Sequence, residues 1–551
     1  MAATAHTDSA TPASPIARPA PRPRGDWDAW GSEPARLPAA AKAIVATLLP
    51  GKAHPVPRRQ VPELTPSLIS DADLGALADV VGGHHASRAD AVRLLHLGGK
   101  STPDLLHRRM DGLQNAPDAV VSPADHDQIA AVLGVCDDRG IAVVPFGGGT
   151  SVVGGVEPER GEHAAVIALD LSRTAALLAL DEVSLLASFG AGTTGPQAEE
   201  LLGARGFTLG HFPQSFPYAS LGGFAATRSS GQASRGYGRF DDLVHALRIA
   251  TPAGDLDLGR SPASAAGPDL RELFLGSEGA FGVLTEVTVR VRPLPGATAY
   301  RAWSFPDFAT GTAALREATQ RGIRPTVLRL SDATETRVNA AMGGHLTRMR
   351  GCLAIATFEG AILEEAEAAR DALDTVFAAH GATSRGEDPA RSWERGRFSS
   401  PALRDTLMDT GVLAETLETA TTWANLPALK QAVTDALTAS LTASGTKPVV
   451  LCHISHVYPA GASLYLTVIA ALGEDPQAQW KTAKDAASRA IGHANGTITH
   501  HHAVGRDHRP YLATEIGPLG VELLRAVKAV LDPRGIMNPG ALVAPRSDTG
   551  A

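Results

Sequence analysis

The order of apolar and polar residues predicts a chain in which helices alternate with short buried strands. Residues 141–144 (IAVV) are apolar throughout and residues 166–171 (VIALDL) nearly so, which is typical of strands covered on both faces. Ahead of them, Ser122 is the expected N-cap of a helix that ends at Gly140, and the apolar positions of that helix recur at helical spacing: Ile129, Val132, Leu133 and Cys136. These patterns indicate a helix packed on a sheet.

The second half of the chain continues this mixture. Residues 361–381 (AILEEAEAARDALDTVFAAHG) place apolar side chains on one face of a long helix, whereas residues 464–470 (LYLTVIA) form an apolar, partly β-branched run typical of a strand. Residues 283–291 (VLTEVTVRV) alternate as a strand with one covered face does. We therefore expect an α+β fold with more than one domain.

Composition and charge exclude several classes of function. The chain has 551 residues, 44% of them hydrophobic, so it can bury large cores. Its net charge is −8, from 50 basic and 58 acidic residues, and we expect no nucleic-acid partner because polyanion binding needs a basic surface. The cysteines, Cys136, Cys352 and Cys452, lack metal-ligand or disulfide spacing, which fits a reducing compartment. No stretch approaches the roughly 18 to 20 apolar residues that cross a bilayer.

A run of glycines directly follows the strand at residues 141–144. Residues 145–151 read PFGGGTS, and glycines without a Cβ atom let the main chain turn sharply and bring N–H donors against an anion such as a pyrophosphate. The loop does not match the dinucleotide fingerprint GxGxxG, because Pro145 opens it and a strand follows it instead of a helix. Taken alone, such a loop is as often a plain turn as a cofactor site.

Two further clusters of small residues follow. One covers residues 214–223 (QSFPYASLGG) and continues to residues 227–230 (TRSS), and the other is residues 276–282 (GSEGAFG). Small and hydroxyl-bearing residues allow a close approach of backbone groups and short donors to a ligand. Each cluster by itself is more often a turn, but the three in sequence favour a cofactor site.

These segments, together with LDPRGIMNPGAL at residues 531–542, resemble the FAD-binding flavoprotein family of vanillyl-alcohol oxidase and p-cresol methylhydroxylase. In that family the glycine loop holds the FAD pyrophosphate. Many members tether FAD through a histidine where this chain has Phe146, so the resemblance implies noncovalent FAD. The cofactor-binding residues that it implies are Pro145, Phe146, Gly147, Gly148, Gly149, Thr150, Ser151, Gln214, Ser215, Ser220, Gly222, Gly223, Thr227, Arg228, Ser229, Ser230, Glu278, Gly279, Gly282 and Val283.

The resemblance also implies a domain order and a fold class. We expect a disordered tail at 1–25, a helical N-terminal segment at 26–115 that packs outside the core, and an FAD-binding domain of two subdomains at 116–297. An α+β cap domain with an antiparallel sheet is expected at 298–490, and a C-terminal segment at 491–551 returns to the flavin.

The segments on the substrate side narrow the resemblance to one branch of the family. Relatives that oxidise 2-hydroxy acids carry GDGNLH and GEHGIG, whereas this chain has GASLY at residues 461–465 and HHHAVG at residues 500–505. These motifs, with HISHVY, VLRLSD and LRD, resemble the alkyldihydroxyacetonephosphate synthases. That likeness implies a non-redox exchange in which a long-chain fatty alcohol replaces the acyl group of acyl-dihydroxyacetone phosphate through an adduct on flavin N5.

The likeness implies roles for several residues. Tyr465 is the candidate proton carrier, which requires nearby cations or a strong donor to make its phenol acidic; from periodicity alone it is an interior strand tyrosine. His500, His501 and His502 are candidate donors and proton shuttles, and in an extended segment the outer two would share one face. A histidine run could also hold a metal or be a polar loop, but no convergent partner is evident, so we expect no metal. Arg329 and Arg404 are candidate anion holders.

Three interpretations of the function stay open. The alkyl transferase is favoured, an FAD-dependent oxidase or dehydrogenase of a hydroxy acid or alcohol is the alternative, and a lipid or flavin carrier with a decayed site is the third. No peroxisomal signal is recognisable and the Ala and Arg bias is typical of bacteria, so we expect a cytoplasmic bacterial protein. The sequence leaves open a peripheral contact with membranes, which amphiphilic substrates favour, and a homodimer.

Overall fold

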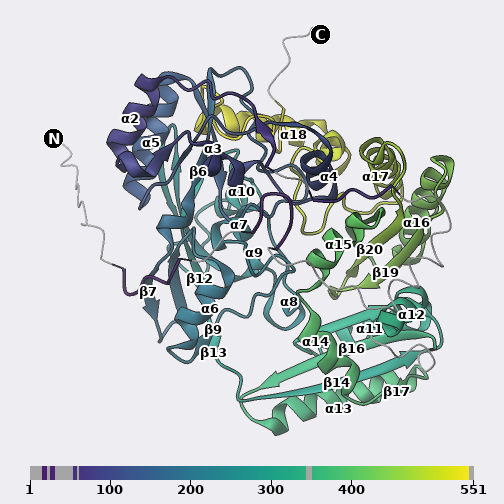
Figure 1. Ribbon diagram of the computed structural model, residues 1–551. Coiled ribbons are helices and arrows are strands. Elements are labelled where there is room, and N and C mark those ends of the chain that lie inside the picture. Colours follow the sequence, from purple (N-terminus) through teal and green to yellow (C-terminus); the bar gives the residue numbers. More distant parts are fainter. Residues whose placement is uncertain (1–14, 22–24, 32–53, 59–60, 343–349, 545–551) are drawn as a thin grey trace.

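The computed structural model describes residues 15–21, 25–31, 54–58, 61–342 and 350–544 (Figure 1). Part of the predicted tail is ordered within these ranges, because Ala17 and Leu177 exchange backbone N–H···O hydrogen bonds of 3.2 and 2.9 Å. The prediction of a disordered tail therefore does not hold for residues 15–21, while residues 1–14 and 22–24 lie outside the described residues. Among the described helices, none has both the length and the apolar character that crossing a bilayer requires.

The first subdomain is a mainly parallel sheet with helices packed on it. Its strand order is β2-β4-β6-β5, in which only the β2–β4 pair is antiparallel. The strands are β2 (Ala86–Ser87), β4 (Ala119–Val121), β5 (Ile141–Phe146) and β6 (Ala165–Asp170), and the neighbouring helices are α2 (Asp71–Val81), α3 (Asp90–Arg93) and α5 (His126–Arg139). The predicted strands and helix are confirmed, but Asp125 rather than Ser122 is the N-cap of α5, since its carboxylate accepts from the Gln128 N–H at 2.9 Å.

The N-terminal segment was predicted to pack outside the core, but part of it belongs to the core of this subdomain. Ile69, Leu77 and Val81 are buried in one cluster with Ile129 and Val143, and β2 extends the sheet. Further along, α4 (Thr102–Met110) contacts elements of the cap domain, and β1 (Glu63–Leu64) pairs with β3 (Leu113–Gln114). The segment lies in the core because its short strands and helices supply apolar side chains that cover the sheet.

The second subdomain is an antiparallel sheet of strand order β11-β10-β12-β8-β7. Its strands are β7 (Leu177–Asp181), β8 (Leu186–Gly190), β10 (Val244–Thr251), β11 (Gly254–Leu258) and β12 (Val283–Arg290), with the small pair β9 (Phe207–Thr208) and β13 (Arg292–Pro293) beside it. The surrounding helices are α6 (Gly195–Gly203), α7 (Leu221–Ala226), α8 (Ser234–Tyr237), α9 (Phe240–Leu243) and α10 (Arg271–Phe274). The predicted strand at residues 283–291 is thus confirmed as β12.

The cap domain is built on a large antiparallel sheet, as predicted, and lies in the lower right half of Figure 1. Its strands, in sheet order, are β17 (Thr383–Ser384), β14 (Ala297–Phe305), β16 (Cys352–Gly360), β15 (Val327–Ser331), β19 (Val449–Ile454), β20 (Gly461–Ala471) and β18 (Val412–Thr422). One core cluster joins this sheet to α11 (Phe308–Gln320), α13 (Leu363–Ala379), α16 (Leu426–Ala443) and α17 (Pro476–His493). The remaining helices are α12 (Ala333–Met342), α14 (Asp388–Gly396) and α15 (Ser400–Asp409).

The C-terminal segment packs against the first two subdomains. Helix α18 (Leu512–Leu531) packs Val521, Leu524 and Val527 against the core of the second subdomain. Beyond it, Met537 forms a parallel bridge with Val143 of β5, directly before the glycine loop. The last described residues therefore complete the sheet edge that carries the loop.

Candidate active site

A cavity of about 1260 Å³ lies between the two subdomains and the inner face of the cap sheet. This volume exceeds the roughly 300–1,000 Å³ of most small-molecule sites, so it can hold a large cofactor and a second ligand. Every cofactor-binding residue predicted from the three glycine-rich segments lines it except Phe146, Arg228 and Val283. Segments spread over residues 145–282 of the sequence thus meet around one space.

The glycine loop forms a wall of main chain. It begins at the end of β5, and a Cβ atom on Gly148 would lie 2.1 Å from the Tyr218 carbonyl oxygen, because the segment before α7 packs directly against the loop. The Ser151 hydroxyl accepts from the Gly155 N–H at 2.9 Å and holds the end of the loop in place. Only glycine permits this backbone-to-backbone approach, which exposes N–H groups along the wall.

The three exceptions point away from the cavity. Phe146 is buried between Val120 and Ala168, and its ring centroid lies 4.7 Å from that of His96. Arg228 has φ 50° and forms ion pairs with Asp241 and Glu272. Val283 belongs to the core of the first subdomain. Strand alternation and these ion pairs turn the three side chains from the cavity, so their assignment as cofactor-binding residues stays a prediction.

An observation independent of the glycines shows that the wall fits a polar ligand. Among the described residues, buried side-chain atoms at the cavity without a hydrogen-bond partner include Oε1 of Gln214, Oε1 of Gln232 and Nε of Arg404. Buried polar atoms are normally paired, so such atoms facing a cavity indicate a missing partner. Hydroxyls of Thr150, Ser215 and Ser230 line the same space. The residues fit the phosphate, ribose and ring-edge groups of FAD.

The three histidines wrap around one buried carboxylate. Glu418 on β18 accepts backbone hydrogen bonds from His500, His501 and His502 at 2.6, 2.9 and 2.7 Å. Although burial acts to raise it, the interactions with His501 and His502 hold the pKa of Glu418 well below its ordinary value. The segment is a turn around this anion, so the outer two histidines do not share a face as an extended segment would require; His501 and His502 line the cavity instead.

His500 is turned toward a second tyrosine. The hydroxyl of Tyr458 lies 2.6 Å from Nε2 of His500, whose Nδ1 lies 3.0 Å from Nδ1 of His501. Burial lowers the pKa of His500 well below its ordinary value and that of His502 to about 3. Burial therefore favours the neutral form of both imidazoles near pH 7.

Tyr465 lines the cavity from β20, the strand next to the β18 edge of the cap sheet. On β20 it is paired in register with Glu418 of β18 and His453 of β19, and its ring stacks on that of His453 at 4.9 Å. Burial raises the pKa of Tyr465 to about 12, against a hydrogen bond with Thr416 that lowers it. The expected acidification is therefore wrong for the protein alone, and Tyr465 is a protonated phenol near neutral pH.

Arg329 and Arg404 both line the cavity, and each has a carboxylate nearby. Arg329 on β15 is paired with Glu335 and contacts Nδ1 of His453 at 3.0 Å. Although burial acts to raise it, His453 and Arg329 lower the pKa of Glu335 to about 2. Arg404 donates to the Lys100 carbonyl and lies 3.7 Å from Glu415. Each guanidinium keeps further N–H groups that can meet an anion.

Comparison with known proteins agrees with this geometry. Two family models match, an FAD binding domain over residues 117–257 and the C-terminal domain of FAD linked oxidases over residues 294–542. The alkyldihydroxyacetonephosphate synthase of Trypanosoma brucei brucei is 31% identical over 88% of this chain and 82% of its own length, and that of Dictyostelium discoideum is 30% identical over 82% and 77%. The chain belongs to the alkyldihydroxyacetonephosphate synthase family.

Solved structures support the same assignment. An alkyldihydroxyacetonephosphate synthase superposes with a TM-score of 0.81 at 26% identity, over 94% of this chain and 98% of the other. p-Cresol methylhydroxylase superposes with a TM-score of 0.64 at 15% identity, over 87% and 98%, and shares the fold. The predicted fold class and the FAD cofactor are thereby confirmed for this synthase-family chain.

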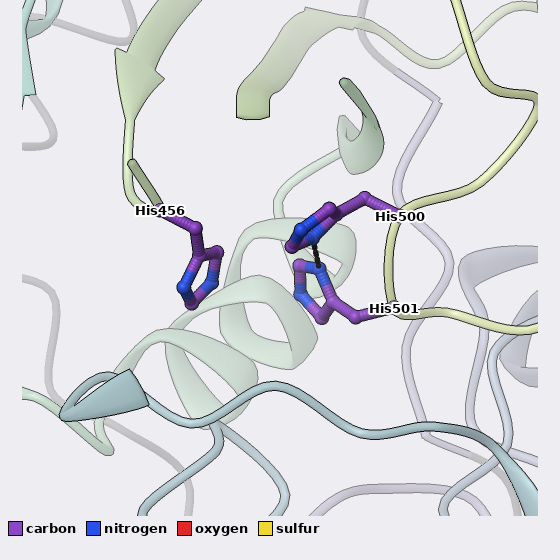
Figure 2. A group of neighbouring side chains, drawn as sticks. All are labelled: His456, His500 and His501. Atoms are coloured by element: carbon purple, nitrogen blue, oxygen red, sulfur yellow. Dashed lines mark hydrogen bonds between the residues drawn. The ribbon is translucent and has the colours of Figure 1, made fainter. Parts of the chain in front are cut away.

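Sequence reasoning missed functional candidates that the fold brings to the histidines. Glu418 and His456 are buried and Tyr458 is half-buried beside the triple histidine of this synthase-family site, and Figure 2 shows His456 next to His500 and His501. His456 and Tyr458 belong to the HISHVY motif, where polar residues end an otherwise apolar strand, and that signal could have found them. Glu418 gave no comparable signal, because its role depends on the pairing of β18 with β20.

Proposed function

We propose that the protein exchanges the acyl group of acyl-dihydroxyacetone phosphate for a long-chain fatty alcohol, giving alkyl-dihydroxyacetone phosphate and a free fatty acid. The C–O bond to the acyl group breaks and one to the alcohol oxygen forms, so atoms and electrons balance without an external oxidant. The observation that carries the proposal is the single cavity in which the glycine loop, Tyr465, His501, His502 and Arg329 meet. When bound, FAD supplies an electron sink for the ketone phosphate.

The side chains around this cavity suit the separate tasks of the exchange. Arg329 and Arg404 offer planar N–H groups to a phosphate dianion. The imidazoles of His501 and His502 and the phenol of Tyr465 can pass a proton between the substrate carbon and the departing or entering oxygen.

The cap side of the cavity also suits long alkyl chains. Its apolar lining residues come from α12, β16, α14, α15 and β20 and include Val338, Leu353, Ile355, Trp393, Leu403 and Ile469. Apolar chains gain about 0.8 kcal/mol per buried CH₂ group, so such a wall favours fatty alcohols over short ones. A conventional hydroxy-acid substrate needs no apolar wall of this kind.

The test is an oxygen-free incubation of the flavin-containing protein with acyl-dihydroxyacetone phosphate and a labelled long-chain alcohol. We expect label in an ether product, an equal amount of free fatty acid and no lasting loss of flavin absorbance. The alternative, an oxidase or dehydrogenase, is favoured by the match to FAD linked oxidases and by a D-lactate dehydrogenase of Arabidopsis thaliana that is 27% identical over 78% of this chain. Flavin bleaching by a hydroxy acid without ether formation would establish that alternative.

We further propose that the flavin is bound without a covalent link. The position at which relatives tether it is Phe146, which has no nucleophile and is turned behind the cavity wall. Acid precipitation of the purified protein should therefore release all yellow colour into the supernatant. Colour that stays with the pellet after washing would contradict this proposal.

Peripheral contact with a lipid surface in the cytoplasm is a third part of the proposal, because both substrates are amphiphiles. Helix α18 supports it, because beside its core-facing residues it exposes Leu519, Leu523 and Val530, at 73%, 61% and 70% of their surface. Exposed leucines and valines on one helix face can enter the interfacial region of a bilayer.

A further inference from the structure

Three imidazoles from two distant segments converge beside the cavity. His456, just beyond the end of β19, faces His500 and His501 of the C-terminal segment (Figure 2). One ring nitrogen from each of the three lies within 4.8 Å of the other two. His456 and His500 are buried and His501 is half-buried, so the arrangement is held by the fold and not by loose side chains at the surface.

Hydrogen bonds on the far side of two rings fix their orientation. The Ser230 hydroxyl lies 3.3 Å from Nδ1 of His456, and the Tyr458 hydroxyl lies 2.6 Å from Nε2 of His500. Metal-binding imidazoles use one nitrogen for the metal and the other for such a partner, which sets the tautomer and the ring direction. These contacts leave Nε2 of His456 and Nδ1 of His500 for a ligand, next to Nδ1 of His501.

The spacing suits a tetrahedral cation. Zinc–nitrogen bonds of about 2.0–2.1 Å at tetrahedral angles put neighbouring ligand nitrogens about 3.3 Å apart. The Nδ1 atoms of His500 and His501 are 3.0 Å apart, so a modest separation of these two rings reaches that value. His456 and His501 both line the cavity, so a fourth position on the cation would face it and take water or an anion.

The surroundings add a negative charge. Glu418, whose oxygens bind the backbone N–H groups of His500 and His501, lies 3.4 Å from Nδ1 of His501 and is buried. A carboxylate in contact with the imidazoles lowers the cost of placing a divalent cation among them. Imidazole nitrogen is a preferred ligand for zinc, and a set of three histidines with one open position is a known zinc arrangement.

We propose that His456, His500 and His501 form a binding site for one zinc-class divalent cation. The site corrects the expectation, drawn from sequence, that the histidine run has no convergent partner; His456 is that partner. A bound cation would take up the lone pairs of imidazoles that the proposed exchange needs free, so zinc would inhibit ether formation. That last consequence rests on the proposed function, whereas binding itself does not.

The experiment measures metal content and affinity of the flavin-containing protein, without an activity readout. After removal of adventitious metal, titration with Zn²⁺ followed by calorimetry and elemental analysis should give one ion per chain, and Co²⁺ should give ligand-field bands of tetrahedral strength. His456→Asn should abolish the stoichiometric ion. Tyr458→Phe, which keeps the three ligands and removes the hydroxyl on His500, should weaken zinc binding by about 10- to 100-fold.

A matched control is available in an adjacent histidine pair outside the site. His84 is exposed next to His85, and His84→Asn should leave the zinc titration unchanged. Flavin content and the far-ultraviolet circular dichroism of each variant report whether it is folded. Absence of stoichiometric zinc binding by the folded parent protein, or binding that His456→Asn leaves intact, would overturn the proposal. A failed ether assay would instead bear on the proposed function alone.

Discussion

At the scale of single residues, the carboxylate of Glu418 organises the histidine segment. Besides three backbone N–H groups, it accepts the Thr499 hydroxyl at 2.7 Å, and it is 3% exposed. Ionised acceptors form stronger hydrogen bonds than neutral ones, and here four donors share two oxygens. The positions of the three histidines are therefore set by Glu418, a side chain on strand β18 of the cap domain, and not by their own sequence.

Glu418→Gln tests this role. An amide keeps the size but offers one acceptor oxygen and turns an NH₂ group toward N–H donors, so we expect a loss of about 2 kcal/mol of unfolding free energy. Because the folded pKa of Glu418 is depressed, its contribution is complete above the unfolded value of about 4.3 and is lost as the pH falls further. Denaturant unfolding of both proteins from pH 7 to pH 3 should show the difference shrinking below about pH 4; a constant difference would contradict the prediction.

Tyr465→Phe separates the phenol from its ring. The variant keeps the stacking on His453 and removes the one hydroxyl, so flavin content should stay at the parent level while ether formation falls by about 100-fold or more, the usual contribution of a general acid or base. Label transfer from the fatty alcohol measures the loss. Undiminished transfer in a variant with full flavin content would remove Tyr465 from the mechanism.

The positions of the candidate site residues could be predicted from the sequence, but their pKa values could not. Five of the candidate residues line the cavity, and each belongs to a motif on which the family resemblance rests: Arg329, Arg404, Tyr465, His501 and His502. The pKa shifts of these side chains could not be predicted from the sequence. The raised pKa of Tyr465 arises from burial between paired strands, and only the folded sheet shows that burial.

At the scale of elements, the short helix α7 fixes the second glycine-rich segment against the sheet. Ser220 is its N-cap, accepting from the Gly223 N–H at 3.2 Å, and Gly222 faces Ala191 just after β8. A Cβ atom on Gly222 would lie 2.7 Å from that of Ala191, a distance that real Cβ atoms do not adopt. The helix can lie this close to the sheet only because its second residue has no side chain.

Gly222→Ala should therefore overpack this contact and cost about 1 to 3 kcal/mol of unfolding free energy, with less flavin retained on gel filtration. Gly134→Ala on α5 is the control, because a Cβ atom there meets nothing within 4 Å. In that open helical position alanine should raise stability by about 0.5 to 1 kcal/mol and leave flavin content unchanged. Equal effects of the two substitutions would refute the packing argument.

Helices and strands were predicted well where the hydrophobic periodicity was strong, and poorly where they depend on packing against segments distant in the sequence. The glycine-loop strand, β12 and α13 follow from local pattern alone. The N-terminal segment did not, because β2 has two residues and finds its partner β4 only through tertiary pairing. The start of α5 was misplaced by three residues, since Ser122 and Asp125 are both good caps and the chain uses the later one.

At the scale of the whole molecule, we expect the purified protein to float with vesicles of phosphatidylcholine and phosphatidylglycerol in a density gradient. Leu519→Glu places a charge on the exposed face of α18 and should reduce the bound fraction by about tenfold or more. Val183→Glu provides the control, since Val183 is 96% exposed on the turn between β7 and β8, far from α18 in sequence. Parent protein that stays at the bottom of the gradient would count against membrane contact.

The bridge between Val143 and Met537 also sets an order of events during synthesis. Asn538, the next residue, donates from its side-chain amide to the carbonyls of Gly155 and Glu278 at 2.8 and 2.6 Å, joining the turn just after the first glycine-rich segment to the third. These segments can therefore be joined only after residues 537–538 have been synthesised, long after the strands of the first subdomain have left the ribosome. A stop codon ahead of the codon for Asn538 would remove this link, and we expect the resulting polypeptide not to retain flavin.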